Sequence, residues 1–474
     1  KDLDAIGGSM YDATFSRNSI ATVTDHEGIV RTVKANEARF QGARRVEQLC
    51  DEPNDLQASG WSLLAGATVQ SASQVTLDAT GNSRIYFTKQ TAYKAGEEYR
   101  STAEIRLLSG TGLGVNIRCQ NETTWTQAGT EITVTGEWVK FSSPVLERDA
   151  GSTGMLLVIA NTSTGPTEQV LEVRNAQIEI VTDASNQAPS EFLDPAVDYG
   201  ANVTGVKYFD TTNGNSVDVN GVVTEAAGTA LTTLDGILIE EESTNTVSSS
   251  DDLTTGWSAS NGTVIDDYQT VTFAAVTNSS FEIGGQTASV DRTLTCQARM
   301  VTGTGLFRMG WSGGSSGDLA LTDQWQTFEY SANVAGLFVQ FLNGTDGASR
   351  QIQVRHIQNE DATYATSFIP TAGAAVTRLA DDCQTAWPAG LVNDFVAVHD
   401  TRQNAFIASA RIIDASSDIN NEVGTYNVIN DSAMYRRVGG AWQGFSTGLN
   451  IPEDGTTVTL KNRWSTTQGM DMWL

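Results

Sequence analysis

A tryptophan set among polar residues is the feature of this sequence that could best bind a ligand. Trp125 lies in "NETTWTQ" (121–127), where its large apolar ring has no apolar neighbour. An exposed indole stacks on the apolar side of a pyranose ring, while nearby amides and guanidiniums bond the sugar hydroxyls. Arg118, Gln120 and Asn121 precede the tryptophan and could supply those bonds. We therefore predict a glycan-binding site at these four residues.

Trp311 is a second candidate for a glycan platform. It alternates with Phe307 and Met309 in "GLFRMGWS" (305–312), so one face of a strand carries all three side chains. An apolar face of this kind favours a place in a core, and an exposed platform is the alternative.

The residue types needed for catalysis do not form a recognisable constellation. "GWSGG" (310–314) and "GGSSG" (313–317) match the G-x-S-x-G pattern, but that elbow needs a strand-to-helix turn and this is a glycine-serine loop. His26, His356 and His399 show no metal-ligand spacing. Neighbouring glutamates in "EEES" point to opposite faces of a strand, unlike the facing pair of a glycosidase. We predict no catalytic residue and no enzyme; glycan degradation by the C-terminal region is the alternative.

Two turn aspartates are candidate ligands of a structural calcium ion. Asp25 in "TDHEG" and Asp346 in "NGTDG" could each contribute to the six to eight or so oxygens that calcium takes. Turn geometry alone also accounts for aspartate at such places. Apart from this calcium, no cofactor is expected. The four cysteines show no C-x-x-C pair and no zinc spacing, which favours free thiols.

Composition places the chain among large, mostly β proteins. At roughly 150 residues per domain, its 474 residues predict about three domains. Its 44 glycines and many Thr, Ser and Val residues favour short strands over helices. The net charge of −27 repels phosphate backbones, so nucleic acid is not expected as a partner. The longest apolar run, "GMLLVIA" (154–160), is too short for membrane insertion.

One turn sequence occurs twice, as "SGTGLGVNIRC" (109–119) and "TGTGLFRMGWS" (302–312). The strands before both turns alternate in the same way, with Cys296 in place of Ala103 on the apolar face. A buried thiol of this kind acts as a small apolar side chain. Five strand-sized blocks recur in the same order, so the chain contains a duplicated β-domain.

Four tryptophans recur as two pairs. Trp61 corresponds to Trp257, and Trp138 corresponds to Trp325. Because both copies keep them amid alternating strands, we predict that all four anchor the cores of two sandwiches.

Hairpins and turn signals mark the borders of the copies. A hairpin with a glycine turn, at Gly28 and at Gly221, leads into each copy. Beyond the second copy, strand-like runs and a hairpin on Gly439-Gly440 predict a third β-domain, and the chain stops within a strand-like run.

Three segments resemble motifs of tailed-bacteriophage virion proteins. "ATFSRNSIATVTDHEGIVRTVKANEARF" (13–40) is similar to a lead motif, F-[ST]-R-x-S-x-A-T, followed by a D-x-x-G hairpin and A-N-x-x-R-F. "LDGILIEEESTN" (234–245) resembles the segment that follows the lead, and "ATSFIPTAGAAVTRLAD" (365–381) resembles the closing segment. The second lead departs from the motif because it lacks the arginine. In such proteins a jelly-roll sandwich similar to carbohydrate-binding modules lies between these segments, and a concanavalin-like lectin sandwich often follows.

The resemblance and the repeat together predict an all-β fold of tandem jelly-roll β-sandwiches with hairpin lead-ins, then a lectin-like β-sandwich incomplete at its C-terminus. The predicted divisions are a lead hairpin (1–45), the first jelly roll (46–182), a linker with the second lead hairpin (183–233), the second jelly roll (234–380) and the lectin-like domain (381–474).

The resemblance implies a tail fibre, spike or head-decorating fibre that is assembled in the bacterial cytoplasm and exposed on the virion. Its implied partners are other virion proteins, host surface polysaccharide and further copies of itself, with a trimer favoured. The alternatives are a purely structural decoration protein without a ligand and a polysaccharide depolymerase.

Overall fold

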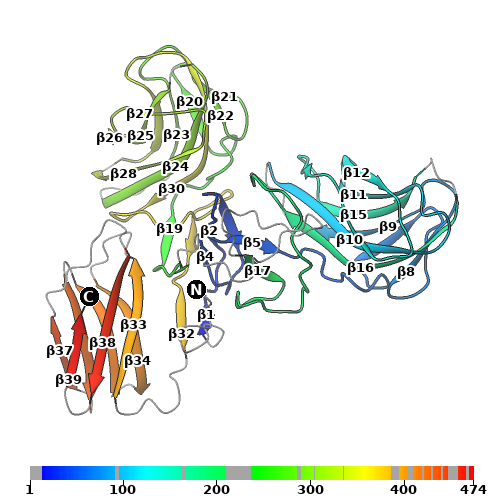
Figure 1. The fold of residues 1–474 in the computed structure, drawn as a ribbon. Helices are drawn as coiled ribbons and strands as arrows, with labels where there is room; N and C mark the ends of the chain where they lie inside the picture. Colours follow the sequence, from blue (N-terminus) through cyan, green and yellow to red (C-terminus); the bar gives the residue numbers. More distant parts are fainter. Residues whose placement is uncertain are drawn as a thin grey trace. The chain divides into compact units, whose positions relative to one another are not determined.

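The chain is all-β in the part that the structure describes. The computed structural model describes residues 13–90, 96–162, 167–209, 236–284, 290–303, 305–334 and 336–385, and seven strands between Asp394 and Trp473. None of these residues forms a helix, and so no helix long enough to cross a membrane is found among them. The chain divides into two compact units, and Figure 1 shows the strands of each.

The first sandwich is made by two antiparallel sheets. Its strands are β6 (Trp61–Leu64), β7 (Thr68–Val69), β8 (Gln74–Leu77), β9 (Arg84–Gln90), β10 (Glu98–Ser109), β11 (Val115–Asn121), β12 (Gln127–Ile132), β13 (Val139–Ser142), β14 (Leu146–Glu147), β15 (Gly154–Asn161) and β16 (Gln169–Ile180). One sheet has the order β13-β10-β16-β8-β7, with β14 also beside β10, and the other has the order β12-β11-β15-β9-β6. The nested pairs β8·β16, β9·β15, β10·β13 and β11·β12 are those of a hairpin rolled into a jelly roll.

The second sandwich repeats this order strand by strand. Its strands are β20 (Ser258–Ser260), β21 (Val264–Ile265), β22 (Thr270–Phe273), β23 (Ser280–Ile283), β24 (Val290–Thr302), β25 (Leu306–Trp311), β26 (Gly314–Ser315), β27 (Leu319–Ala320), β28 (Gln326–Val334), β29 (Val339–Asn343) and β30 (Arg350–Glu360). The sheets run β28-β24-β30-β22-β21 and β26-β25-β29-β23-β20, with β27 also beside β25. The predicted duplication of a β-domain is therefore confirmed.

The repeated glycine turn has a steric cause. Gly112 lies against the strand end that follows β12, and a Cβ at this position would lie 1.9 Å from the carbonyl oxygen of Val134. In the second copy, a Cβ at Gly305 would lie 2.2 Å from the carbonyl oxygen of Leu321. Backbone hydrogen bonds of 2.8 and 2.7 Å close these two contacts. Only glycine leaves room for that approach.

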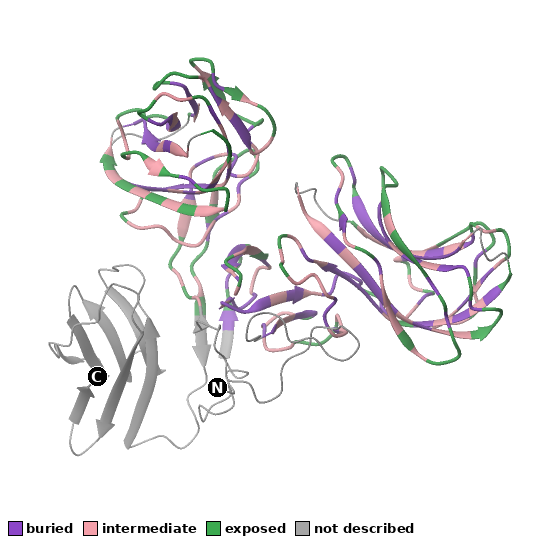
Figure 2. Cartoon of the chain, turned by 45° about the horizontal axis from the view of Figure 1, so that its top comes forward, coloured by how far each residue is buried: buried purple, intermediate pink, exposed green. Residues whose placement is uncertain are grey.

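The cores follow the predicted alternation. Ala103 and Cys296 are 0% and 1% exposed at matching places of β10 and β24, and Cys119 and Cys50 are also buried free thiols. Desolvation raises the pKa of Cys119 to about 12, which leaves this thiol neutral and unreactive. The side chain of Cys383 lies outside the described residues. In Figure 2, buried and exposed residues alternate along strands of both sandwiches.

A small set of short strands joins the ends of the two sandwiches, and we call it the base. Its strands are β1 (Ala13–Ser16), β2 (Ala21–Thr24), β3 (Val30–Val33), β4 (Phe40–Gln41), β5 (Arg44–Glu47), β17 (Val206–Phe209), β18 (Gly236–Ile237), β19 (Ser243–Asn245), β31 (Val376–Arg378) and β32 (Asp382–Thr385). The predicted first lead hairpin is β2·β3, with its turn at Gly28. The second, at Gly221, lies outside the described residues.

Each sandwich leaves and re-enters the base through a pair of antiparallel strands. The pair β5·β17 brackets the first sandwich and β19·β31 brackets the second. A buried amide then ties the two ends together: Gln48 Nε2 donates to the carbonyls of Ala176 and Leu193, at 2.9 and 3.2 Å. Asn245 does the same in the second sandwich, at 3.0 and 2.9 Å. The region predicted as a linker thus supplies strand β17 of the base.

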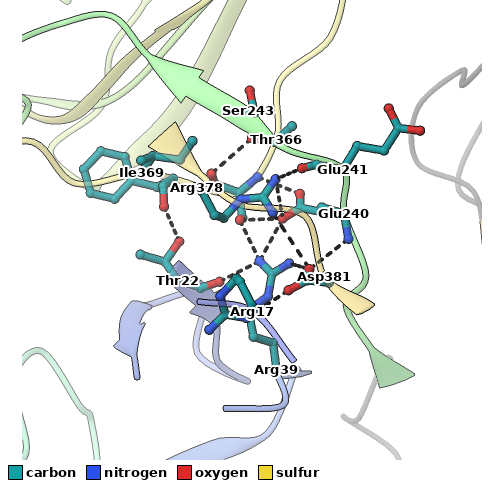
Figure 3. Close-up of polar contacts among 12 residues, drawn as sticks. Arg17, Thr22, Arg39, Glu240, Glu241, Ser243, Thr366, Ile369, Arg378 and Asp381 are labelled. Atoms are coloured by element: carbon teal, nitrogen blue, oxygen red, sulfur yellow. Dashed lines mark hydrogen bonds and ion pairs between the residues drawn. The ribbon is translucent and has the colours of Figure 1, made fainter. Parts of the chain in front are cut away.

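Buried ion pairs hold the base together (Figure 3). The side chains of Arg17, Arg39 and Arg378 are fully buried and meet two carboxylates. Asp381 accepts from Arg17 Nη1 at 2.9 Å and also from Arg39, and Glu240 accepts from Arg39 Nη1 at 2.7 Å. These five residues come from the three segments that carry the virion-protein motifs, and Arg17 is the arginine that the second lead lacks.

The second compact unit contains two further antiparallel sheets. Its strands are β33 (Asp394–Arg402), β34 (Ser409–Asp418), β35 (Asn421–Val428), β36 (Asp431–Val438), β37 (Ala441–Ser446), β38 (Thr457–Ser465) and β39 (Gly469–Trp473). They pair in the orders β33-β38-β39 and β34-β35-β36-β37. The predicted hairpin on Gly439-Gly440 is β36·β37, joined from Val438 to Ala441, while the turn residues lie outside the described part.

Replacing Asp381 by Asn should destabilise the base strongly. The change removes the carboxylate shared by Arg17 and Arg39, which leaves buried charge unpaired at a cost of about 3–5 kcal/mol. Urea denaturation combined with limited proteolysis of the lead segment measures this loss. Asp51→Asn is the matched control, because the Asp51–Lys89 pair is exposed and should contribute less than about 1 kcal/mol. Equal losses in the two variants would contradict a structural role of the buried pairs.

Acid should weaken the base through Glu240. Burial by itself raises the pKa of Glu240, but Arg39, Arg378 and the hydroxyl of Ser367 outweigh it, so the pKa lies below its ordinary value. The stabilisation is thus complete above the unfolded pKa of about 4.3 and is lost as the pH falls through the lower folded value. In thermal melts, Glu240→Gln should be less stable than the parent at pH 7 and less sensitive to pH below about 4.5. An unchanged acid dependence would refute this assignment.

Candidate functional site

The outer face of the sheet β12-β11-β15-β9-β6 carries an apolar strip that does not belong to the core. Strand β15 is buried on both faces: Met155, Leu157 and Ile159 point into the core, so the intervening residues point outward. The outward residues are only 1% exposed, and together we call them the outer strip: Leu156, Val158 and Ala160. Outward side chains of a two-layer sandwich normally meet water, so flanking side chains must shield this strip.

Longer side chains on the neighbouring strands flank the outer strip. Strand pairing places Arg118 of β11 and Tyr86 of β9 on either side of Val158. Two residues after Val158, Ala160 lies beside Arg84 of β9. Two residues before Val158, Leu156 lies beside Gln120 of β11. The face therefore offers an apolar floor between two rows of polar and aromatic groups.

Trp125 extends over this face from the turn between β11 and β12. Its ring is 55% exposed, and its backbone φ of 62° is held by a hydrogen bond from its amide to the Asn121 carbonyl at 3.1 Å. The guanidinium carbon of Arg84 lies 5.9 Å from the indole centroid. Because Arg84 belongs to β9, two strands away from β11, the indole reaches across the sheet toward it.

Two arginines on this face lack acidic partners. Arg118 Nη1 donates to Gln127 Oε1 at 2.6 Å, while its buried Nε has no partner among the described residues. Burial lowers the pKa of Arg118, and the nearby charge of Arg84 lowers it further. No carboxylate in the described part of the chain makes an ion pair with Arg84 or Arg118. Together with Trp125 and Tyr86, they form what we call the outer-face site.

The predicted glycan contacts divide between this site and the framework. Trp125 and Arg118 lie on the outer face. Gln120 lies on the same face but is only 2% exposed, and its Oε1 has no hydrogen-bond partner among the described residues. The prediction for Asn121 is wrong: it is fully buried, its Nδ2 donates to the Glu147 carbonyl, and its Oδ1 accepts the Asp149 amide, both at 3.1 Å.

Trp311 lies in the core, as its alternation with Phe307 and Met309 favours, and the alternative of an exposed platform is wrong. Its ring is 0% exposed in the second core, packs against Tyr330 and donates from Nε1 to Asn359 Oδ1 at 2.8 Å. In the first sandwich Cys119 holds the corresponding inward place, because Gly114 adds one residue before β11. The segment "GWSGG" that contains Trp311 is the hairpin β25·β26, so it lacks the strand-to-helix turn of a nucleophile elbow.

The two predicted pairs of core tryptophans behave differently. Trp61 and Trp257 are 7% and 8% exposed within the cores, and each indole donates to a backbone carbonyl. Trp138 and Trp325 are only half-buried, which contradicts the prediction.

The alternation of side chains along a strand explains why Trp138 and Trp325 are not in the cores. Trp138 is one position out of phase with the inward-facing Phe141, so it lies on the outer face of its sheet. Its ring there contacts the guanidiniums of Arg106 and Arg174, 4.8 and 4.1 Å from the centroid, and two arginines lie equally close to Trp325.

The candidate calcium ligands are engaged in ion pairs. Asp25 accepts from Arg31 Nε at 2.9 Å and from two backbone amides of its own turn. Asp346 pairs with Arg350. Among the described residues, no group of three or more potential metal ligands comes together.

Arg84 and Tyr86 were not singled out from the sequence. The segment "RIYFTKQ" (84–90) does alternate, with Ile85 and Phe87 inward, so a charged and an aromatic residue on its outward face were a usable signal. Their relation to Trp125 depends on β9 and β11 pairing with opposite edges of β15, which local pattern does not reveal.

The second sandwich keeps the framework and not the site. The register of β23, β29 and β25 places Ser280, Glu282 and Gly310 where the first sandwich has Arg84, Tyr86 and Arg118. Gln340 stands in place of Val158. The outer-face site is thus specific to the first sandwich.

No family model and no curated protein matches the chain. Among solved structures, it is similar to the N-terminal CBM22-1–CBM22-2 tandem domain of Paenibacillus barcinonensis Xyn10C, at 12% identity over 67% of this chain and 97% of that one, with a TM-score of 0.23. The CBM22-1 xylan-binding domain of Xyn10C matches at 16% identity over 29% of this chain and 94% of that one, with a TM-score of 0.23. The arabinose-bound α-L-arabinofuranosidase MgGH51 matches at 13% identity over 28% of this chain and 26% of that one, with a TM-score of 0.24.

Replacing Arg118 by Gln should not lower the stability of the first sandwich. The guanidinium forms no ion pair and lies close to the like charge of Arg84, so its removal relieves repulsion. Arg106→Gln is the control on the other sheet, where an ion pair with Glu172 is lost and about 0.5–1 kcal/mol should go with it. Urea denaturation of both variants measures the difference. A larger loss for Arg118→Gln than for Arg106→Gln would show that Arg118 stabilises the fold.

Proposed function

We propose that the chain is a non-enzymatic structural protein of a bacteriophage particle whose first sandwich binds host surface glycan. The observation that carries the binding role is the outer-face site, where exposed Trp125 lies near the guanidinium of Arg84, and Arg118 and Tyr86 flank an apolar strip on the same face. An aromatic platform with polar groups around it suits a sugar, whose ring has apolar faces and a polar rim.

The motifs shared with tailed-phage proteins support the virion role. Residues from all three motif segments meet in the buried ion pairs of the base, including Arg17, Asp381 and Glu240. We place the protein on the particle surface as a tail fibre, spike or head-decorating fibre, bound to other virion proteins. A single sugar site binds weakly, so a homo-oligomer, with a trimer favoured, supplies several sites at once.

A ligand-free structural role suits the second sandwich. At the places of the outer-face site it has Ser280, Glu282 and Gly310, and Arg308 on that face donates to the carbonyls of Asn343 and Thr277. It therefore serves in this proposal as a spacer built on the same framework.

Replacing Trp125 by Ala should weaken glycan binding by the full chain about ten-fold or more. The change removes a stacking surface that contributes about 0.5–1.5 kcal/mol beyond the apolar area it buries. Surface polysaccharides purified from candidate host bacteria, immobilised for biolayer interferometry, provide the measurement.

Leu113→Ala is the matched control, since Leu113 is 54% exposed at the turn before β11 and should leave binding unchanged. Unchanged binding by Trp125→Ala would remove this site. Failure of the parent protein to bind any polysaccharide would favour the purely structural alternative, and release of reducing ends would favour a depolymerase.

A further inference from the structure

We propose that the outer-face site takes an acidic glycan, with the carboxylate of a uronic acid or similar sugar bound between Arg118 and Arg84 while the sugar ring stacks on Trp125. This inference rests on the proposed glycan-binding function and adds the chemical class of the ligand.

The charge of the protein makes the two arginines unusual. The chain carries 56 acidic against 29 basic residues, so acidic partners for surface arginines are plentiful. On the other sheet of the same sandwich, Arg106 pairs with Glu172 and Arg174 pairs with Glu104, at 2.5 and 2.7 Å. Arg84 and Arg118 face each other without such a partner in the described part of the chain. Two like charges held together are stable only beside an anion or at a cost in free energy.

The geometry allows one anion to meet both guanidiniums. Arg118 and Arg84 lie on β11 and β9, which flank β15, and their partners on β15 are two residues apart, so their Cα atoms are about 12 Å apart at the usual strand spacing and rise. Both side chains are long enough to converge above the outer strip, and burial and then the charge of Arg84 lower the pKa of Arg118. The planar guanidinium fork matches the two oxygens of a carboxylate.

Unpaired buried polar atoms also point to a missing partner on this face. Arg118 Nε and Gln120 Oε1 are both buried without hydrogen bonds among the described residues. Gln120 as a whole is only 2% exposed. A buried polar atom without a partner costs about 1–3 kcal/mol. A sugar carboxylate and an adjacent hydroxyl would satisfy the Arg118 donor and the Gln120 acceptor respectively.

The second sandwich shows that this charge is not required by the framework. Its strands have the same order, yet Ser280 and Glu282 stand in place of Arg84 and Tyr86. That face carries Glu282, and its arginine, Arg308, already donates to the carbonyls of Asn343 and Thr277. The arginines without acidic partners are therefore a feature of the first sandwich and not of the shared framework.

The test compares each glycan with its own uncharged form. Oligogalacturonate, alginate and hyaluronan oligosaccharides are titrated calorimetrically into the full chain, before and after chemical reduction of their carboxyl groups to alcohols. At least one of them should bind about ten-fold more tightly in its carboxylate form, and the difference should shrink between 20 and 200 mM salt, roughly as Debye screening predicts. Arg118→Gln should abolish the preference while leaving affinity for the reduced form unchanged.

Lys89→Gln is the matched control for Arg84→Gln. Both residues lie on β9 and both changes remove one positive charge, but Lys89 pairs with Asp51 on the opposite face. Only Arg84→Gln should reduce binding of the carboxylate form, with thermal melts confirming that both variants are folded.

The outcomes separate this inference from the proposed function. Equal binding of charged and reduced oligosaccharides, or binding of neutral glycans alone, would overturn the acidic ligand and leave glycan binding through Trp125 in place. Absence of binding to any glycan, charged or neutral, would overturn both.

Discussion

The buried carboxylate of Asp381 is the constraint on which the order of the whole larger unit depends. Arg17 and Arg39 are fully buried in the lead segment, and removing the anion that pairs with a buried guanidinium is strongly destabilising. Both anions that they use, Asp381 and Glu240, lie on the segments that bracket the second sandwich. The lead can therefore be packed only when the chain has passed through both sandwiches and returned.

The two sandwiches share the inward faces of their strands and differ on the outward faces. At inward positions one small apolar side chain can replace another, as Cys296 replaces Ala103, because a core needs only suitable volume and apolar character. Outward positions differ in charge and aromatic content, as Tyr86 and Glu282 show. Duplication thus preserved one face of each sheet and left the other free to differ.

Much of the fold could be predicted because it depends on local alternation. The period of two in β10 and β24 was enough to place Ala103 and Cys296 inward and to identify the repeat. The predictions fail for residues whose place depends on which face of a strand they occupy or on pairing between strands that are distant in the sequence. Trp138 has a counterpart, Trp325, in the second copy, as a core residue would. It is three positions before the inward-facing Phe141, however, so its side chain lies on the opposite, outward face.

The candidate site shows the same limit. Trp125 could be found from its polar neighbours, whereas Asn121, four residues away, is hydrogen-bonded to the backbone of Glu147 in β14 and of Asp149 just after it. Arg84 joins Trp125 only because β15 lies between β9 and β11, and that neighbourhood is a property of the jelly-roll order. Of the base, only the lead hairpin β2·β3 was predicted, because strand pairs such as β5·β17 and β19·β31 join residues more than a hundred positions apart.

The adjacent strands that bracket each sandwich have a consequence for how such chains diversify. Residues 182–205 belong to the base, as Asn202 shows by donating to the carbonyls of Phe15 and Asn36. The first sandwich is therefore an insertion between Leu49 and Ile178, which are neighbours because the Leu49 amide donates to the Ile178 carbonyl at 3.1 Å. A domain with similarly close termini can replace the sandwich at that point and leave the contacts of residues 182–205 with the base in place. Exchange of a whole sandwich then replaces one outer face by another in a single step.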